Sequence, residues 1–185
     1  MNITLLLTLG APIVIVLSIV YLDKFKEPTD LILKTFFIGI LLCIPAGVLN
    51  DLLIDSYEQS YRAGLTEESL KFLVLYFYIR TQTAFDEPMD AIVYGTIISL
   101  GFATLENFSY VYDISSEAES LNTAILRSMS AIPLHATCGI IMGYFFGLHA
   151  FLNSKLALLQ SIVIPVGIHA SYNYLTGSQD LLWFY

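Results

Sequence analysis

Long apolar runs dominate the pattern of hydrophobic and polar positions along the chain. Residues 3–22 contain no charged side chain, and a membrane-spanning helix needs about 20 mostly apolar residues. Similar runs occupy residues 31–54, 91–112 and 156–175, and a longer run occupies residues 121–152. Short polar segments separate these runs. The pattern therefore predicts one membrane-spanning helix in each run, joined by short loops.

Two segments need a separate interpretation. Residues 65–85 form the least apolar run, because Glu67, Glu68 and Lys71 lie at its start, but we still predict a span there. Residues 121–152 are too many for a simple span. We expect residues 121–130 to lie at the membrane interface and the helix to enter near Pro133, since proline is tolerated in membrane helices. Near the end of the chain, Trp183 and Tyr185 suit an interface.

The composition supports a membrane protein. Hydrophobic residues make up 56% of the 185 residues and charged residues only 13%, whereas soluble domains have about 25% charged residues. We predict an all-α fold, a polytopic membrane helix bundle of about six transmembrane helices that forms a single domain over residues 1–185. The lipid bilayer is then its surroundings. The sequence contains no basic patch that would indicate nucleic acid as a partner. Both cysteines, Cys43 and Cys138, lie in apolar runs, where a thiol behaves as a small hydrophobic group. We therefore predict no disulfide.

The distribution of Lys and Arg predicts the orientation in the membrane. The rule that cytoplasmic loops are rich in Lys and Arg places the N-terminus outside, in a protein of the cell (plasma) membrane. Most of the basic residues then lie at cytoplasmic ends, namely Lys24, Lys26, Lys34, Arg80 and Lys155, and Arg62 and Arg127 lie outside.

With this topology, polar residues from separate spans gather at similar depth. Glu67 and Glu68 start the third span, and Glu106 lies roughly 9 Å from the end of the fourth. His135 lies a short way into the fifth span, and His169 lies near the end of the sixth. Ionisable side chains are rare inside membranes and by default indicate function. We therefore predict a functional site near the extracytoplasmic face.

The paired glutamates have a functional and a structural interpretation. Glu67 and Lys71 are spaced i,i+4 and share a helix face, whereas Glu68 points about 100° away. Lys71 would then hold Glu67, and Glu68 would be the free carboxylate. The structural alternative is an ordinary helix start, with Thr66 as N-cap and acidic residues in the first turn. For Glu106, the alternative is a structural pair with Arg127 or Lys71.

Histidines complete the chemistry that these carboxylates allow. His169 and Asn173 are spaced i,i+4 and share a face, and His135 follows Pro133. A carboxylate can act as a general base, and a His/His/Glu set can hold zinc with an open position for water. The chain has no H-E-x-x-H motif, so a metal site would have to form between separate helices. His149 lies at the opposite end of its span and has no predicted role in the site.

The order of these motifs resembles that of the PrsW family of intramembrane proteases. The resemblance covers residues 66–175, where we suspect the protease core, and the wider group of CAAX-prenyl proteases and bacteriocin-processing homologues (CPBP) is similar to that family. The matching motifs are Glu67-Glu68-x-x-Lys71, Glu106-Asn107, Arg127 with Pro133-x-His135, and His169-x-x-x-Asn173.

The resemblance implies a peptidase of the metalloprotease class that acts on a membrane protein or peptide substrate. It implies Glu67 or Glu68 as the base and His135 as a residue that orients water. His169 and Asn173 would be oxyanion donors, or His169 a metal ligand. Lys71, Glu106, Asn107 and Arg127 would support the site. Zinc, if used, would be held by Glu106, His135 and His169.

Two other functions use the same residue types. A small proton-coupled transporter also contains buried Glu and His, but it favours polar groups spread through the membrane and an inverted repeat, and neither is evident. A non-catalytic membrane protein that binds peptides is the other alternative. The sequence predicts no oligomeric state.

Overall fold

The computed structural model describes residues 2–177, and the predicted interface residues Trp183 and Tyr185 lie outside this range. Short 3-10 helices, Tyr57–Gln59 and Ile79–Thr81, flank α3. The α-helices are α1 (Ile3–Leu22), α2 (Thr29–Leu53), α3 (Tyr61–Phe77), α4 (Pro88–Tyr112), α5 (Glu117–Met129), α6 (Ala131–Leu152) and α7 (Lys155–Gly177).

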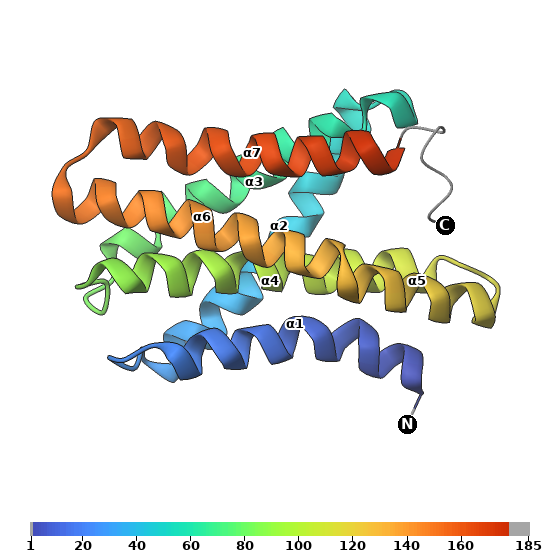
Figure 1. The fold of residues 1–185 in the computed structure, drawn as a ribbon, viewed down its shortest axis with the longest axis horizontal. Helices are drawn as coiled ribbons and strands as arrows, with labels where there is room; N and C mark the ends of the chain where they lie inside the picture. Colours follow the sequence, from blue (N-terminus) through green and yellow to red (C-terminus); the bar gives the residue numbers. More distant parts are fainter. Residues whose placement is uncertain (1, 178–185) are drawn as a thin grey trace.

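Helices α1, α4, α6 and α7 run roughly along one axis, α2 crosses them obliquely, and α5 and α6 together make one pass (Figure 1). As a result, α1 begins and α7 ends at the same end of the molecule, on the right of the figure. Among the described residues, five helical segments are long and apolar enough to cross a membrane: α1, α2, α4, the segment Glu117–Leu152 that comprises α5 and α6, and α7. The predicted all-α membrane bundle is confirmed.

Helix α3 differs from the span predicted over residues 65–85. It has 17 residues, a length of about 26 Å, and it is not among the five apolar helices. The reason is that α3 packs against α2, α4 and α7, so that Glu68 and Lys71 are fully buried. A helix whose polar side chains face protein rather than lipid does not need an apolar surface all round.

The interfacial segment expected before the fifth span is a separate helix. Helix α5 ends at Met129, and α6 begins at Ala131. Pro133 lies in the first turn of α6, where its missing N–H group breaks no helical hydrogen bond.

Helix α4 is the centre of the bundle and packs against α1, α2 and α6. Its contact with α6 is very close, because a Cβ atom on Gly143 would lie 2.2 Å from the carbonyl oxygen of Ala91. Small residues allow such contacts between membrane helices. An apolar core that includes Leu75, Ile98 and Phe146 fills the bundle between α3, α4 and α6.

Candidate active site

Thr66 lies inside α3 and is not its N-cap. The helix begins at Tyr61, with Ser60 in the N-cap position. The Thr66 hydroxyl donates to the carbonyl of Ala63 at 3.0 Å and also to Asn50 of α2. The helix-start alternative is therefore wrong, because the two glutamates lie beyond the first turn, where unpaired backbone N–H groups would favour acids.

Lys71 pairs more closely with Glu68 than with Glu67. Its Nζ atom lies 2.7 Å from Glu68 Oε1 and 3.9 Å from Glu67 Oε2. The expectation that Lys71 holds Glu67 and leaves Glu68 free is therefore not what the structure shows. Spacings of i,i+3 and i,i+4 both bring helical side chains together, and Glu68 Oε1 also lies 2.8 Å from His169 Nδ1.

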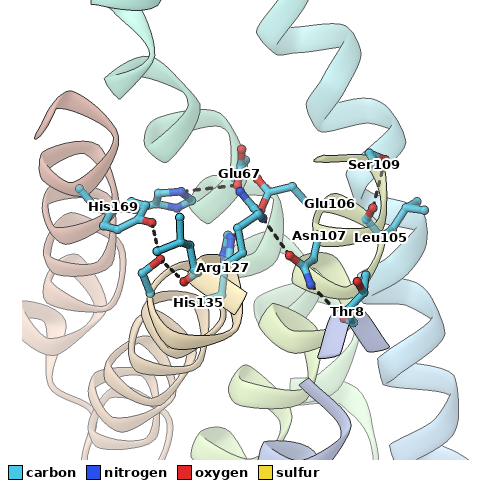
Figure 2. A network of polar contacts seen from close by, with 12 residues as sticks. Thr8, Glu67, Leu105, Glu106, Asn107, Ser109, Arg127, His135 and His169 are labelled. Carbon is cyan, nitrogen blue, oxygen red and sulfur yellow. Dashed lines mark hydrogen bonds and ion pairs between the residues drawn. The ribbon is translucent and has the colours of Figure 1, made fainter. Parts of the chain in front are cut away.

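Glu67 has one engaged and one unengaged oxygen. Asn50 Nδ2 donates to Glu67 Oε1 at 3.4 Å. The other oxygen, Oε2, is buried with no hydrogen-bond partner in the described part of the chain. It lies 3.8 Å from His169 Nε2, and Figure 2 shows these two side chains facing one another. Buried polar atoms normally have partners, so this oxygen marks a place for a water molecule, proton or ion.

Glu106 connects Arg127 to His135. Its Oε2 atom lies 2.5 Å from Arg127 Nη2 and 3.1 Å from His135 Nε2. Arg127 also donates from Nε to Asn107 Oδ1 at 2.9 Å, and Asn107 Nδ2 donates to the carbonyl of Thr8 in α1 at 2.9 Å (Figure 2). The alternative that Glu106 pairs with Arg127 is confirmed, but the same carboxylate oxygen also contacts a histidine of the site.

Asn173 and His149 lie apart from this cluster. Asn173 Nδ2 donates to the carbonyl of Ser60 at 3.3 Å, which ties α7 to the start of α3. Its role as an oxyanion donor stays a prediction. His149 Nδ1 lies 3.2 Å from the carbonyl oxygen of Ser154, where α6 turns into α7.

Phe102 is a neighbour of the site that the sequence patterns did not indicate. The Phe102 ring lies 4.3 Å from Lys71 Nζ, so its face stabilises the buried cation. The available signal was spacing, because Phe102 is four residues before Glu106 and shares its helix face. Asn50 lies near the outer end of the second predicted span, at the depth of the other polar residues, but no spacing linked it to Glu67.

One group of side chains can hold a metal ion. In the described residues, Glu67, His135 and His169 are the group whose ligand atoms all lie within 4.8 Å of one another. All three are buried. This set contains Glu67 where the predicted set had Glu106. Carboxylate oxygen and imidazole nitrogen are zinc ligands, and the unengaged oxygen of Glu67 fits such a role.

The chain matches known proteins over most of its length. The model of the family described as "PrsW family intramembrane metalloprotease" matches residues 27–185. Protease PrsW of Geobacillus kaustophilus is 35% identical, over 95% of this chain and 80% of that protein. Protease PrsW of Bacillus subtilis is 34% identical, over 89% of this chain and 79% of that protein. No solved structure matches the chain significantly.

These matches confirm the resemblance that the ordered motifs indicated, while the relation to the wider CPBP group stays a prediction. The apolar helices make the protein an integral membrane protein, and the relatives are proteases. The chain therefore belongs to the PrsW family of intramembrane metalloproteases.

Proposed function

We propose that the protein is an intramembrane endopeptidase that hydrolyses a peptide bond of a membrane-protein substrate near the extracytoplasmic side. One observation carries this proposal. Three helices, α3, α6 and α7, bring Glu67, His135 and His169 to within 4.8 Å of one another inside a membrane bundle. A carboxylate beside two imidazoles is the chemistry that activates water for hydrolysis.

Within this site we assign the activating carboxylate to Glu67. Glu68 Oε1 is engaged by both Lys71 and His169, so Glu68 is held in place by its neighbours. Each glutamate has a buried Oε2 atom with no hydrogen-bond partner among the described residues, but it is Glu67 whose Oε2 lies 3.8 Å from His169 Nε2 and whose carboxylate belongs to the group with His135 and His169. This assignment reverses the preference for Glu68 that helix spacing had favoured.

If the protein uses zinc, Glu67 would serve as a ligand of the ion in place of the base, together with His135 and His169. When bound, zinc polarises a carbonyl group and makes water a better nucleophile at neutral pH. The chain's other residues act on these ligands. Glu68 contacts Nδ1 of His169 at 2.8 Å and orients its ring, as carboxylates behind histidine ligands do. Arg127 holds Glu106 beside His135.

The position of the site supports cleavage near one membrane face. Its residues lie near the start of α6 and toward the ends of α4 and α7, at the end of the bundle where α1 begins (Figure 1). The distribution of Lys and Arg favours an extracytoplasmic position for this end, in a protein of the plasma membrane. A single-span protein with its cleavage site just inside this face is the substrate class that fits.

Cleavage of a tagged single-span peptide in proteoliposomes tests the function. We expect Glu67→Gln to lower the cleavage rate at least about 100-fold, because general-base catalysis contributes that much or more. His149→Gln is the matched control, since His149 lies outside the cluster, and it should cleave at the wild-type rate. Size-exclusion profiles of both variants check folding.

Full activity of Glu67→Gln would show that the assignment is wrong. Peptide that binds the wild-type protein but is never cut would favour the non-catalytic alternative. Proton flux without cleavage would favour the transporter.

A further inference from the structure

Pro12 is a buried proline inside α1. Proline has no backbone N–H group, so the helical hydrogen bond from residue 12 to the carbonyl of Thr8, four residues earlier, does not form. Thr8 is fully buried as well. Neither lipid nor a dry protein interior offers a spare donor to such a carbonyl. The Thr8 carbonyl therefore needs a donor from another part of the protein.

Asn107 of α4 supplies this donor. Its Nδ2 atom donates to the carbonyl oxygen of Thr8 at 2.9 Å, and Figure 2 shows the Asn107 side chain turned toward Thr8. The hydroxyl of Thr8 is engaged elsewhere, because it donates to the carbonyl of Thr4 at 2.7 Å. Asn107 is fully buried. The contact thus satisfies a buried amide and the carbonyl that the proline leaves open.

The amide of Asn107 has one orientation that satisfies both of its neighbours. On its other side, Arg127 Nε donates to Asn107 Oδ1 at 2.9 Å. A guanidinium group can only donate, and a backbone carbonyl can only accept. The amide oxygen must therefore face Arg127 while the amide nitrogen faces Thr8. A flipped amide would lose both hydrogen bonds, so the Thr8 carbonyl helps to fix the acceptor that Arg127 meets.

Arg127 transmits this constraint to the site. Its guanidinium group lies over the Tyr110 ring, with the central carbon 4.1 Å from the ring centre. Because the guanidinium is a rigid planar fork, fixing Nε also fixes the direction of Nη2, which lies 2.5 Å from Glu106 Oε2. That carboxylate oxygen lies 3.1 Å from His135 Nε2. Helix α1 therefore reaches the site through hydrogen bonds, although none of its side chains belongs to the site.

We propose that Pro12 is a positioning residue of the site. By leaving the Thr8 carbonyl to Asn107, it fixes the Arg127 guanidinium and, with it, the carboxylate that contacts the histidine of α6. The effect on catalysis rests on the proposed function. The match to the family begins at residue 27, so α1 lies outside the matched range, and its part in the site comes from these contacts alone.

The Pro12→Ala variant distinguishes this role from a merely structural one. Alanine restores the N–H group, so the Thr8 carbonyl regains its helical donor and turns back along the helix axis, away from Asn107. For the tagged single-span peptide we expect kcat to fall about 10-fold, as for other residues that orient a site from behind, with KM unchanged. Alanine favours helix over proline, so a weaker α1 would not explain the loss.

A double-mutant cycle shows whether Pro12 and Asn107 act through one contact. We expect Asn107→Ala to lower kcat about 100-fold, because it also releases Arg127. Adding Pro12→Ala should lower kcat by no more than about two-fold further, whereas independent effects would multiply. The matched control is Ser18→Ala. The exposed Ser18 hydroxyl donates to the carbonyl of Val14 within α1 at 2.7 Å, and kcat of this variant should equal that of the wild type.

Hydrogen exchange of the Asn107 side-chain amide tests the contact without catalysis. In the nitrogen-15-labelled full chain in detergent micelles, the amide signals that are absent from Asn107→Asp belong to Asn107. We expect these protons to exchange slowly with water in the wild type, because the amide is buried and hydrogen-bonded. Exchange should be at least about 10-fold faster in Pro12→Ala, since protection follows the hydrogen bond, and unchanged in Ser18→Ala.

Wild-type kcat in Pro12→Ala, multiplied losses in the double variant, or unchanged amide exchange in Pro12→Ala overturns the proposal. If Asn107→Ala does not fold, kcat and amide exchange of Pro12→Ala decide. Wild-type protein that cuts no peptide refutes the proposed function instead, and the amide exchange then decides by itself whether Pro12 controls the contact between α1 and α4.

Discussion

Glu67 and Glu68 are consecutive residues whose carboxylates meet different partners. Glu68 Oε1 contacts the Lys71 ammonium and His169 Nδ1, whereas Glu67 receives one long hydrogen bond from Asn50 and keeps Oε2 unengaged. A buried carboxylate with two donors on one oxygen is held rigidly. The difference in partners, not in residue type, makes Glu67 the group that can accept a ligand and Glu68 the group that orients His169.

From the contacts of these individual side chains we predict zinc binding. Purified protein should contain about one zinc ion per chain, because one carboxylate and two imidazoles leave the open position of a catalytic zinc site. Glu68→Gln should weaken zinc binding about 10- to 100-fold, the usual effect of losing the carboxylate behind a histidine ligand. Elemental analysis and titration with a fluorescent zinc chelator measure both quantities.

The control is Glu58→Gln, since Glu58 is exposed in the short helix before α3. Metal-free protein that cleaves peptide at full rate would contradict the zinc prediction and would support activation of water by glutamate and histidine alone.

The approach of α3 to α7 brings the glutamates next to His169. A Cβ atom on Gly64 would lie 2.6 Å from the Ala170 nitrogen and 3.2 Å from the His169 carbonyl carbon. Both are backbone atoms, which cannot rotate away as a side chain can. The absence of a side chain at Gly64 is thus a condition for the contact between Glu68 and His169.

We predict that Gly64→Ala separates these helices. Cleavage should fall at least about 10-fold, since small misplacements of catalytic groups have effects of up to about 100-fold, and the Tm should fall as well. Gly167→Ala is the matched control, because a Cβ atom there meets nothing within 4 Å, and alanine favours helix by about 1 kcal/mol over glycine. Equal activity and Tm in the two variants would show that the helices have room at Gly64.

The end of the molecule opposite to the site contains a second group of acidic residues. Asp23, at the end of α1, and Asp90, in the first turn of α4, are buried. Tyr94 donates a hydrogen bond to Glu27 in the α1–α2 loop. Burial raises the pKa of Glu27 to about 7. The carboxyl and charge of Asp90 and the charge of Asp23 add to this effect, and the hydrogen bond from Tyr94 opposes it.

This pKa predicts how stability depends on pH. Since the pKa of Glu27 rises from 4.5 to about 7 on folding, the folded protein keeps a proton that the unfolded chain releases. The free energy of unfolding should therefore fall as pH rises through this window. Between about pH 5 and pH 7.5, the Tm of the Glu27→Gln variant should fall by less than the Tm of the wild type. Scanning fluorimetry in one detergent measures the difference, and equal losses would contradict the prediction.

Much of the fold follows from local sequence. The span predicted over residues 3–22 coincides with α1, and the runs over residues 31–54, 91–112 and 156–175 lie within a few residues of α2, α4 and α7. The run over residues 121–152 covers most of α5 and the whole of α6. The reason is that lipid demands apolar side chains over a defined length and backbone groups that are satisfied within the helix. Helix α3 departs from its prediction because its surroundings are mainly protein, so hydropathy alone is a poor guide to its ends.

The sequence by itself determined that this protein is a membrane helix bundle with glutamates and histidines at one depth, because hydrophobic length and loop order are properties of the linear chain. Only the tertiary structure decided that Lys71 pairs with Glu68, that Thr66 lies inside a helix, and that Glu67 joins His135 and His169. Such choices depend on distances of a few ångströms between helices, as between Glu68 and His169, which are 101 residues apart. Helical spacing constrains neighbours on one helix, but packing between helices selects the atoms that meet.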